Sequence, residues 1–124
     1  MKISIGADHG GFKIKDCLIE LLKEKNIEVI DHGCFNEDPV DYPDHAAAVA
    51  KDVSYKKVDQ GIIICTSGIG VSITANKFSG VRAALCVNKD AARTARAHNN
   101  ANILCLGALH TNCLLYTSPS PRDS

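Results

Sequence analysis

The chain has 124 residues, enough for one domain with a substantial hydrophobic core. Lys and Arg balance Asp and Glu at 14 each, so the formal net charge is zero and the sequence lacks the basic surface typical of proteins that bind nucleic acid or acidic membranes. No apolar run is long enough to span a bilayer and the first residues resemble a strand, not a signal peptide, so we expect a cytoplasmic protein.

Apolar strands alternate with helical segments along the chain. Short β-branched or apolar runs predict strands at 2–7, 27–30, 61–64, 81–86 and 103–106. Helical spacing of apolar residues, or Ala-rich composition, predicts helices at 12–25, 44–55, 71–77 and 89–97. This alternation predicts an α/β fold, a three-layer α/β/α Rossmann-like domain with a five-stranded parallel sheet.

The predicted domain covers residues 1–108. Residues 109–124 show neither a helical nor a strand period and contain a Ser-Pro-Ser-Pro stretch. A final helix that should follow the fifth strand is missing from this sequence. We therefore expect residues 109–124 to be an unrelated or disordered tail.

The loops that follow the strands should lie together. Right-handed crossovers place every strand-to-helix loop at one edge of the sheet, and ligands bind there in such folds. The segments at that edge are 8–11, 32–43, 65–70 and the residues around Asn88. His98 and Asn99 instead follow a helix, so they belong to the opposite edge unless that helix stops early or a partner chain supplies them.

The loop CTSGIG at 65–70 is the strongest candidate site. Cys65 ends a predicted buried strand, and Gly68 and Gly70 let backbone N–H groups turn toward an oxyanion or phosphate. The positive end of the following helix favours the thiolate of a cysteine beside it. The alternative is that Cys65 is a small buried residue. Val71 stands where Cys-dependent phosphatases carry Arg, and no Walker sequence follows.

Other polar pairs allow two interpretations each. Asp8 and His9 are either substrate contacts at the ligand edge or a turn with a helix cap. The Asp-Tyr-Pro sequence at 41–43 is more often a stiff turn, and His98 with Asn99 is either a helix end or functional. Four basic residues fit a solvated face most simply: Lys77, Arg82, Arg93 and Arg96.

The cysteines and histidines do not suggest a metal. Six cysteines at 17, 34, 65, 86, 105 and 113 form no Cys-x-x-Cys pair, which favours reduced thiols over a disulfide framework or a zinc site. The five histidines lack metal-ligand spacing. We expect no metal and no cofactor.

Several segments together resemble the type B ribose-5-phosphate isomerases, a family grouped with the galactose-6-phosphate isomerase subunits. The matching segments are GADHGGF at 6–12, DYP at 41–43, GIIICTSGIGVSITANK at 61–77, VRA at 81–83, AHNNAN at 97–102 and LG at 106–107. The resemblance implies a Rossmann-like α/β/α domain and a homodimer or dimer of dimers with active sites across the subunit interface. Such an interface would let His98 act from the far end of its helix.

The resemblance also implies roles for individual residues. Cys65 would be the base that moves a proton between two sugar carbons, His98 would open the ring, and Ser67 would shuttle a proton. The anion hole for the enediolate would comprise Thr66, Ser67, Gly68, Ile69 and Gly70, and the further substrate contacts would be Asp8, His9, Tyr42 and Asn99. The implied reaction interconverts ribose 5-phosphate and ribulose 5-phosphate in the pentose phosphate pathway.

One departure from the family pattern concerns the phosphate. The family uses arginines after the fifth strand and in the final helix, and Leu109 occupies the first of these positions. We therefore expect this chain to be a weak isomerase.

Three alternatives stay open. Within the family, the chain would be a galactose-6-phosphate isomerase subunit, although the presence of Cys65 and His98 together favours the ribose enzyme. Outside it, the loop would belong to a phosphocarrier domain whose strand-end cysteine is phosphorylated, or to a binding module on the same fold.

Overall fold

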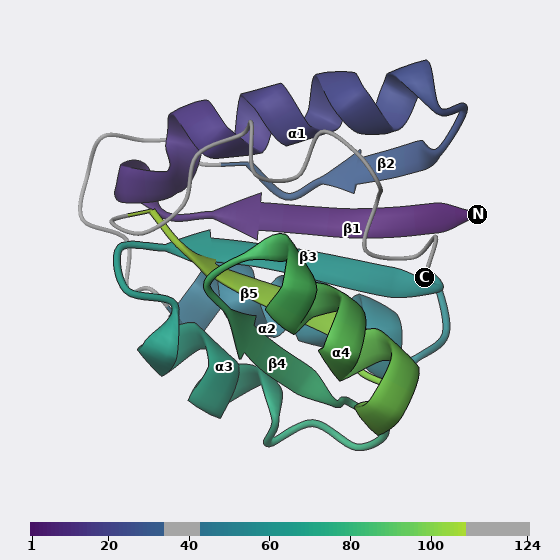
Figure 1. Ribbon diagram of the computed structural model, residues 1–124, viewed down its shortest axis with the longest axis vertical. Coiled ribbons are helices and arrows are strands. Elements are labelled where there is room, and N and C mark those ends of the chain that lie inside the picture. Colours follow the sequence, from purple (N-terminus) through teal and green to yellow (C-terminus); the bar gives the residue numbers. More distant parts are fainter. Residues whose placement is uncertain (34–42, 109–124) are drawn as a thin grey trace.

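A five-stranded parallel sheet forms the centre of the structure, a computed structural model in which residues 1–33 and 43–108 are described (Figure 1). The strands are β1 Lys2–Ala7, β2 Glu28–Asp31, β3 Gln60–Cys65, β4 Ala83–Cys86 and β5 Ile103–Gly107. Their order in the sheet is β2-β1-β3-β5-β4, and every neighbouring pair is parallel. The predicted fold class is confirmed.

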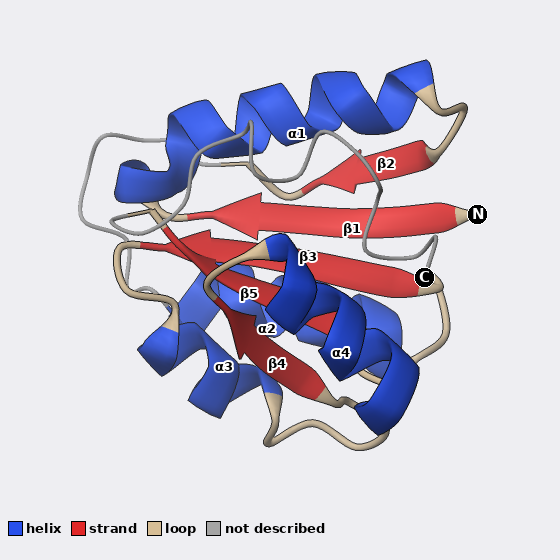
Figure 2. Ribbon diagram, in the orientation of Figure 1, coloured by secondary structure: helices blue, strands red, loops and turns tan. Residues whose placement is uncertain are grey.

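Helices cover both faces of this sheet (Figure 2). They are α1 Phe12–Glu24, α2 Pro43–Ser54, α3 Ile69–Ala75 and α4 Lys89–Asn99, and a 3-10 turn, η1 His9–Gly11, precedes α1. Buried side chains of α1 and α4 pack on one face, and those of α2 and α3 pack on the other.

Strand β3 shows why the central strands are apolar throughout. Ile62 and Ile64 pack in the cluster under α1 and α4, whereas Ile63 and Cys65 pack in the cluster under α2 and α3. Successive side chains of a strand point to opposite faces, so a strand covered on both sides is apolar at every position. Cys65 therefore faces the α2–α3 layer.

Three elements have a boundary two residues away from the predicted one, and the boundaries of the other elements differ by one residue at most. Helix α3 begins two residues early because Gly68, at φ 82°, turns the chain into the helix. Strand β4 begins at Ala83 instead of 81, because the N–H of Val81 bonds to Phe78 O and that of Arg82 bonds to the Asn102 side chain. Helix α4 continues through His98 to Asn99.

Among the cysteines that the structure describes, all but one fit the prediction of reduced thiols. Cys65, Cys86 and Cys105 are free and buried. Cys17 is disulfide-bonded, so the prediction of reduced thiols is wrong for this residue. It lies on the exposed side of α1, where the burial that protects the strand cysteines does not apply.

The described part of the chain contains no helix long and apolar enough to cross a membrane. Within it, no three side chains among His, Cys, Asp and Glu are grouped in a way that would hold a metal ion. The predictions for Tyr42 and for residues 109–124 lie outside the described residues.

Candidate active site

The reversal of strand order between β1 and β3 creates the candidate site. From β1 the chain builds outward to β2 on one side, and β3 lies on the other. Ala7 pairs with Ile64 in the sheet, so Asp8, which follows β1, and Cys65, the last residue of β3, lie side by side. The N–H of Asp8 also donates to Ile64 O at 3.0 Å. Topology therefore brings these two sequence-predicted residues together, as expected for neighbouring parallel strands.

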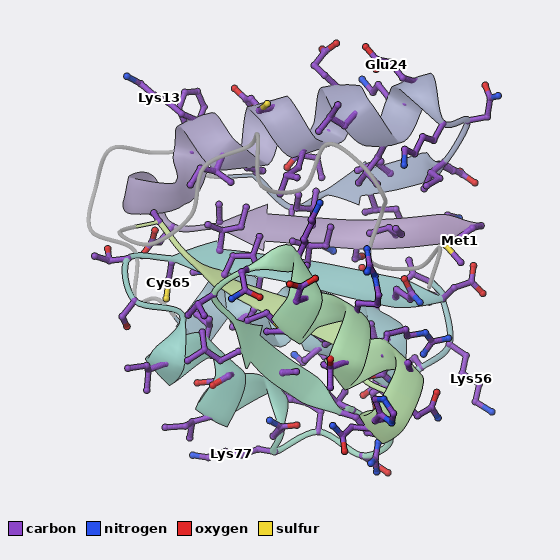
Figure 3. The ribbon with its side chains drawn as sticks, in the orientation of Figure 1. Met1, Lys13, Glu24, Lys56, Cys65 and Lys77 are labelled. Atoms are coloured by element: carbon purple, nitrogen blue, oxygen red, sulfur yellow. The ribbon has the colours of Figure 1, made fainter. Side chains whose placement is uncertain are left out.

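Cys65 lies at the end of β3 beside the start of α3 (Figure 3). Its Sγ accepts a hydrogen bond from the backbone N–H of Gly68 at 2.9 Å. Gly68 reaches this position with a left-handed backbone, which glycine adopts readily. The loop therefore wraps a backbone donor around the sulfur, and the sulfur is a weak acceptor unless it carries charge.

The rest of the loop offers further donors. The N–H of Ile69 donates to Ser67 Oγ at 3.3 Å. The next N–H groups, those of Gly70 and Val71, belong to the first turn of α3, where backbone donors have no intrahelical acceptor. The side chains of Thr66, Ser67 and Ile69 are exposed, so this side of the loop is open to a ligand.

Two glycines hold the loop by close backbone approach. A Cβ on Gly10 would lie 2.9 Å from Thr66 Oγ1, and a Cβ on Gly107 would lie 2.5 Å from Ser67 O. The N–H of Ala108 donates to Cys65 O at 2.7 Å. The loop is thus clamped between η1 and the end of β5. Sequence reasoning gave neither glycine this role, although Gly10 lies in the turn after β1 and Gly107 ends β5, both at the ligand edge.

Asp8 has a structural role that the sequence left as an alternative. Its Oδ1 accepts a hydrogen bond from the N–H of Gly11 at 3.1 Å and so caps η1. Within the described residues its other oxygen, Oδ2, accepts no hydrogen bond and remains for a ligand. His9 follows in η1 and is placed by its backbone at the same edge.

His98 and Asn99 do not reach Cys65 within one chain. They are the last two residues of α4 and both are exposed. Helix α4 ends at the edge of the sheet where the strands begin (Figure 1). The Asn99 carbonyl is tied to Arg82 Nε at 2.8 Å, just before β4. The separation predicted from topology is therefore what the structure shows.

Three of the four basic residues assigned to a solvated face have partners: Arg93 forms a 3.9 Å ion pair with Asp90, and Arg82 and Arg96 donate to residues at and after the end of α4. Arg82 donates to the Asn99 carbonyl, and Arg96 donates to Asn100 Oδ1 at 3.1 Å and to Ala101 O at 3.0 Å. Arg82 is exposed, as predicted, whereas Arg96 is half-buried because the chain after α4 folds back against it.

A Ser–His–Asp trio lies away from this site. Ser4 Oγ and His32 Nε2 both donate to the same oxygen of Asp52, Oδ2. Burial would raise the pKa of Asp52, but the hydrogen bonds from Ser4 and His32 outweigh it and hold that pKa below its ordinary value. Ser4 is fully buried and donates to the carboxylate instead of the imidazole, so the trio is a structural network and not a nucleophilic triad.

Comparisons with known proteins agree with this geometry. The sequence model of the family described as Ribose/Galactose Isomerase matches residues 3–116. Ribose-5-phosphate isomerase B of Escherichia coli is 44% identical over 107 residues, which cover 86% of this chain and 72% of that protein.

Solved structures give the same result. Ribose-5-phosphate isomerase B of Clostridium thermocellum matches with a TM-score of 0.88 and 48% identity, covering 93% of this chain and 78% of that one. The Mycoplasma genitalium ribose-5-phosphate isomerase B, solved with bound ribulose 5-phosphate, matches with a TM-score of 0.88 and 41% identity, covering 94% and 78%. The matches favour an isomerase over the phosphocarrier and binding-module alternatives.

Proposed function

Because the chain belongs to the ribose/galactose isomerase family and is therefore an isomerase, we propose that it interconverts ribose 5-phosphate and ribulose 5-phosphate through an enediolate. The observation that carries the proposal is the Cys65 loop. A thiol stands at the strand-order reversal with a backbone donor 2.9 Å from its sulfur and Asp8 on the neighbouring strand. The Mycoplasma genitalium structure supports the substrate, because that similar protein was solved with ribulose 5-phosphate.

In the proposed reaction, Cys65 as thiolate removes the proton from C2 of the open-chain aldose. The electrons of the broken C–H bond form the C1–C2 double bond, and the carbonyl oxygen becomes an oxyanion. The backbone N–H groups of the 66–70 loop stabilise that oxyanion. Cys65 then returns the proton to C1, while Ser67 moves the hydroxyl proton from O2 to O1. The net change moves one hydrogen from C2 to C1 and one proton from O2 to O1, and no redox cofactor takes part.

The remaining roles follow the same assignment. Asp8 offers its second oxygen to a sugar hydroxyl, and His9 and Tyr42 complete the contacts at this edge. Asn99 binds substrate and His98 opens the sugar ring, but both must come from a second copy of the chain. A ring-opening acid that lies at the opposite edge of its own sheet has no other route to Cys65.

An exposed apolar surface beside the loop supports this assembly. Ile69 and Ile73 lie one turn apart on α3 and are 55% and 59% exposed, and Leu85 and Val87 at the end of β4 are 40% and 52% exposed. Leu85 also contacts the loop, because a Cβ on Gly68 would lie 2.5 Å from its Cδ1. We propose that the homodimer interface covers this surface, so that the partner's His98 and the partner's Asn99 reach the Cys65 loop.

A coupled assay of ribose 5-phosphate conversion tests the proposal. Cys65→Ala should lower kcat/KM by about 10²–10⁴-fold, the range for loss of a general base. Cys86→Ala removes another buried thiol outside the loop and is the matched control. Reaction in D₂O should place deuterium at C1 of the product, because the proton is carried on the Cys65 thiol, which exchanges with solvent.

Two outcomes would contradict the proposal. Near-normal turnover of Cys65→Ala would show that Cys65 is not the base. A product free of deuterium would point to a direct hydride shift. Galactose 6-phosphate serves as the competing substrate, and faster turnover of it would assign the chain to the other branch of the family.

A further inference from the structure

The turn formed by residues 98–102 joins α4 to β5 at the edge where the strands begin. Helix α4 ends at Asn99, and Asn100 takes a left-handed backbone with φ 52° and ψ 40° while its N–H donates to Ala95 O. This ending sets the direction of the chain. The left-handed residue does not by itself immobilise His98 and Asn99, the two exposed residues before it, because the last turn of a helix frays easily.

Arg82 attaches this turn to the rest of the domain at three points. Its Nε donates to the Asn99 carbonyl at 2.8 Å, its backbone N–H donates to Asn102 Oδ1 at 2.8 Å, and its carbonyl accepts from the Asn102 N–H at 3.0 Å. Asn102 Nδ2 also donates to Gly80 O at 2.8 Å. Only the first of these contacts uses the Arg82 side chain, so a substitution there leaves the backbone pairing in place.

The Asn99 carbonyl is a favourable partner for a guanidinium. It is among the last carbonyls of α4, which have no N–H donor within the helix and carry the negative end of the helix dipole. A cationic donor therefore makes a charge-assisted hydrogen bond there. Arg96 holds the following two residues, Asn100 and Ala101, from the helix side.

For the turn at 98–102, the exact placement of His98 and Asn99 matters more to the proposed reaction than the contribution of the turn to folding stability. If His98 and Asn99 act on a substrate bound to another subunit, small displacements of the turn change the reacting distance. A misplacement of about 1 Å costs on the order of 10²-fold in rate. The side chain of Arg82 is exposed, yet its Nε–H donates to the carbonyl of Asn99, the residue next to His98. Such a contact restrains the position of the turn.

On the basis of the proposed function, we infer that Arg82 is a positioning residue of the isomerase reaction. Its guanidinium holds the Asn99 carbonyl, and through it fixes His98 for delivery to the partner's Cys65 loop. Arg82 itself touches no reacting atom.

A double-mutant cycle separates this role from a purely structural one. Arg82→Gln should lower kcat by about 10–100-fold with little change in the unfolding midpoint. Arg82→Lys keeps a cationic donor and should recover part of the loss. Arg93→Gln is the matched control, because Arg93 is an arginine of α4 whose ion pair with Asp90 is 3.9 Å long.

The decisive comparison is in the His98→Ala background. If Arg82 acts through His98, then Arg82→Gln/His98→Ala should turn over no more slowly than His98→Ala alone. Losses that multiply, or full turnover of Arg82→Gln, would overturn the positioning role while leaving the proposed function intact. Full turnover of His98→Ala would instead overturn the assignment of His98 on which this inference rests.

Discussion

Replacing Gly68 with Ala should damage the Cys65 loop more than its backbone angle alone explains. Gly68 and Gly80 have nearly the same left-handed backbone, at φ 82° and 76°. Each Ala substitution costs about 1–2 kcal/mol for that conformation. A Cβ on Gly80 meets nothing within 4 Å, so Gly80→Ala isolates the conformational cost.

At Gly68 the new methyl group also collides with its surroundings. It would lie 2.5 Å from Leu85 Cδ1 and 3.1 Å from both Gly107 N and Leu106 C. The Leu85 side chain is partly exposed and can rotate away, but Gly107 is paired with Cys65 in the sheet and its backbone cannot retreat. The loop must move instead, which adds about 1–3 kcal/mol and pulls the Gly68 N–H from the Cys65 sulfur.

Urea unfolding and turnover of the two variants measure these effects. We expect Gly68→Ala to lose more unfolding free energy than Gly80→Ala and to lose about 10²-fold or more in kcat, the usual effect of displacing an oxyanion donor. Gly80→Ala should keep its turnover. Equal stability losses, with normal turnover for Gly68→Ala, would refute the close packing described for this loop.

Further predictions concern the other cysteines, acid stability and metal. Burial raises the pKa of Cys86 to about 11 and that of Cys105 to about 12, so at pH 8 only about one in 10³ of the Cys86 thiols and one in 10⁴ of the Cys105 thiols are ionised. Limiting iodoacetamide followed by mass spectrometry should therefore label Cys65 before these two. Earlier labelling of Cys86 or Cys105 would contradict this prediction. The lowered pKa of Asp52 contributes stability that is present above its unfolded pKa and lost as pH falls through the folded value. The difference in unfolding free energy between the unsubstituted chain and Asp52→Asn should therefore shrink below about pH 4, and a constant difference would contradict the linkage. Turnover should be the same with and without a chelator, and activity restored by a divalent ion would contradict the proposed chemistry.

The main features of the fold and the central site were predictable from local sequence. Strand β1 has its predicted bounds, because an apolar run ends abruptly at a polar turn. Asp8 and Cys65 were expected to share an edge, since both directly follow apolar strands and parallel strands end at the same side. Their adjacency follows from topology and needs no knowledge of side-chain packing.

The features that were missed depend on contacts between distant residues. The approach of Gly107 to Ser67 and the three contacts of Arg82 join segments separated by many residues, and an exposed arginine looks the same in sequence with or without a partner. The Ser4–His32–Asp52 network has the same origin, because each polar residue fits its own element without revealing the other two. Such pairings become visible only when the sheet order is known.

The central claim is that one active site combines Cys65 of one chain with His98 of another, and subunit complementation tests it most directly. Cys65→Ala and His98→Ala chains are co-expressed with different tags, and the mixed dimers are purified through both. Random pairing makes half of all dimers mixed, and each mixed dimer has one intact site of two. The purified mixed dimers should therefore have about half the turnover of the unsubstituted chain, and the mixture before purification should have about a quarter. Mixed dimers no more active than the two parent variants would contradict a site shared between subunits.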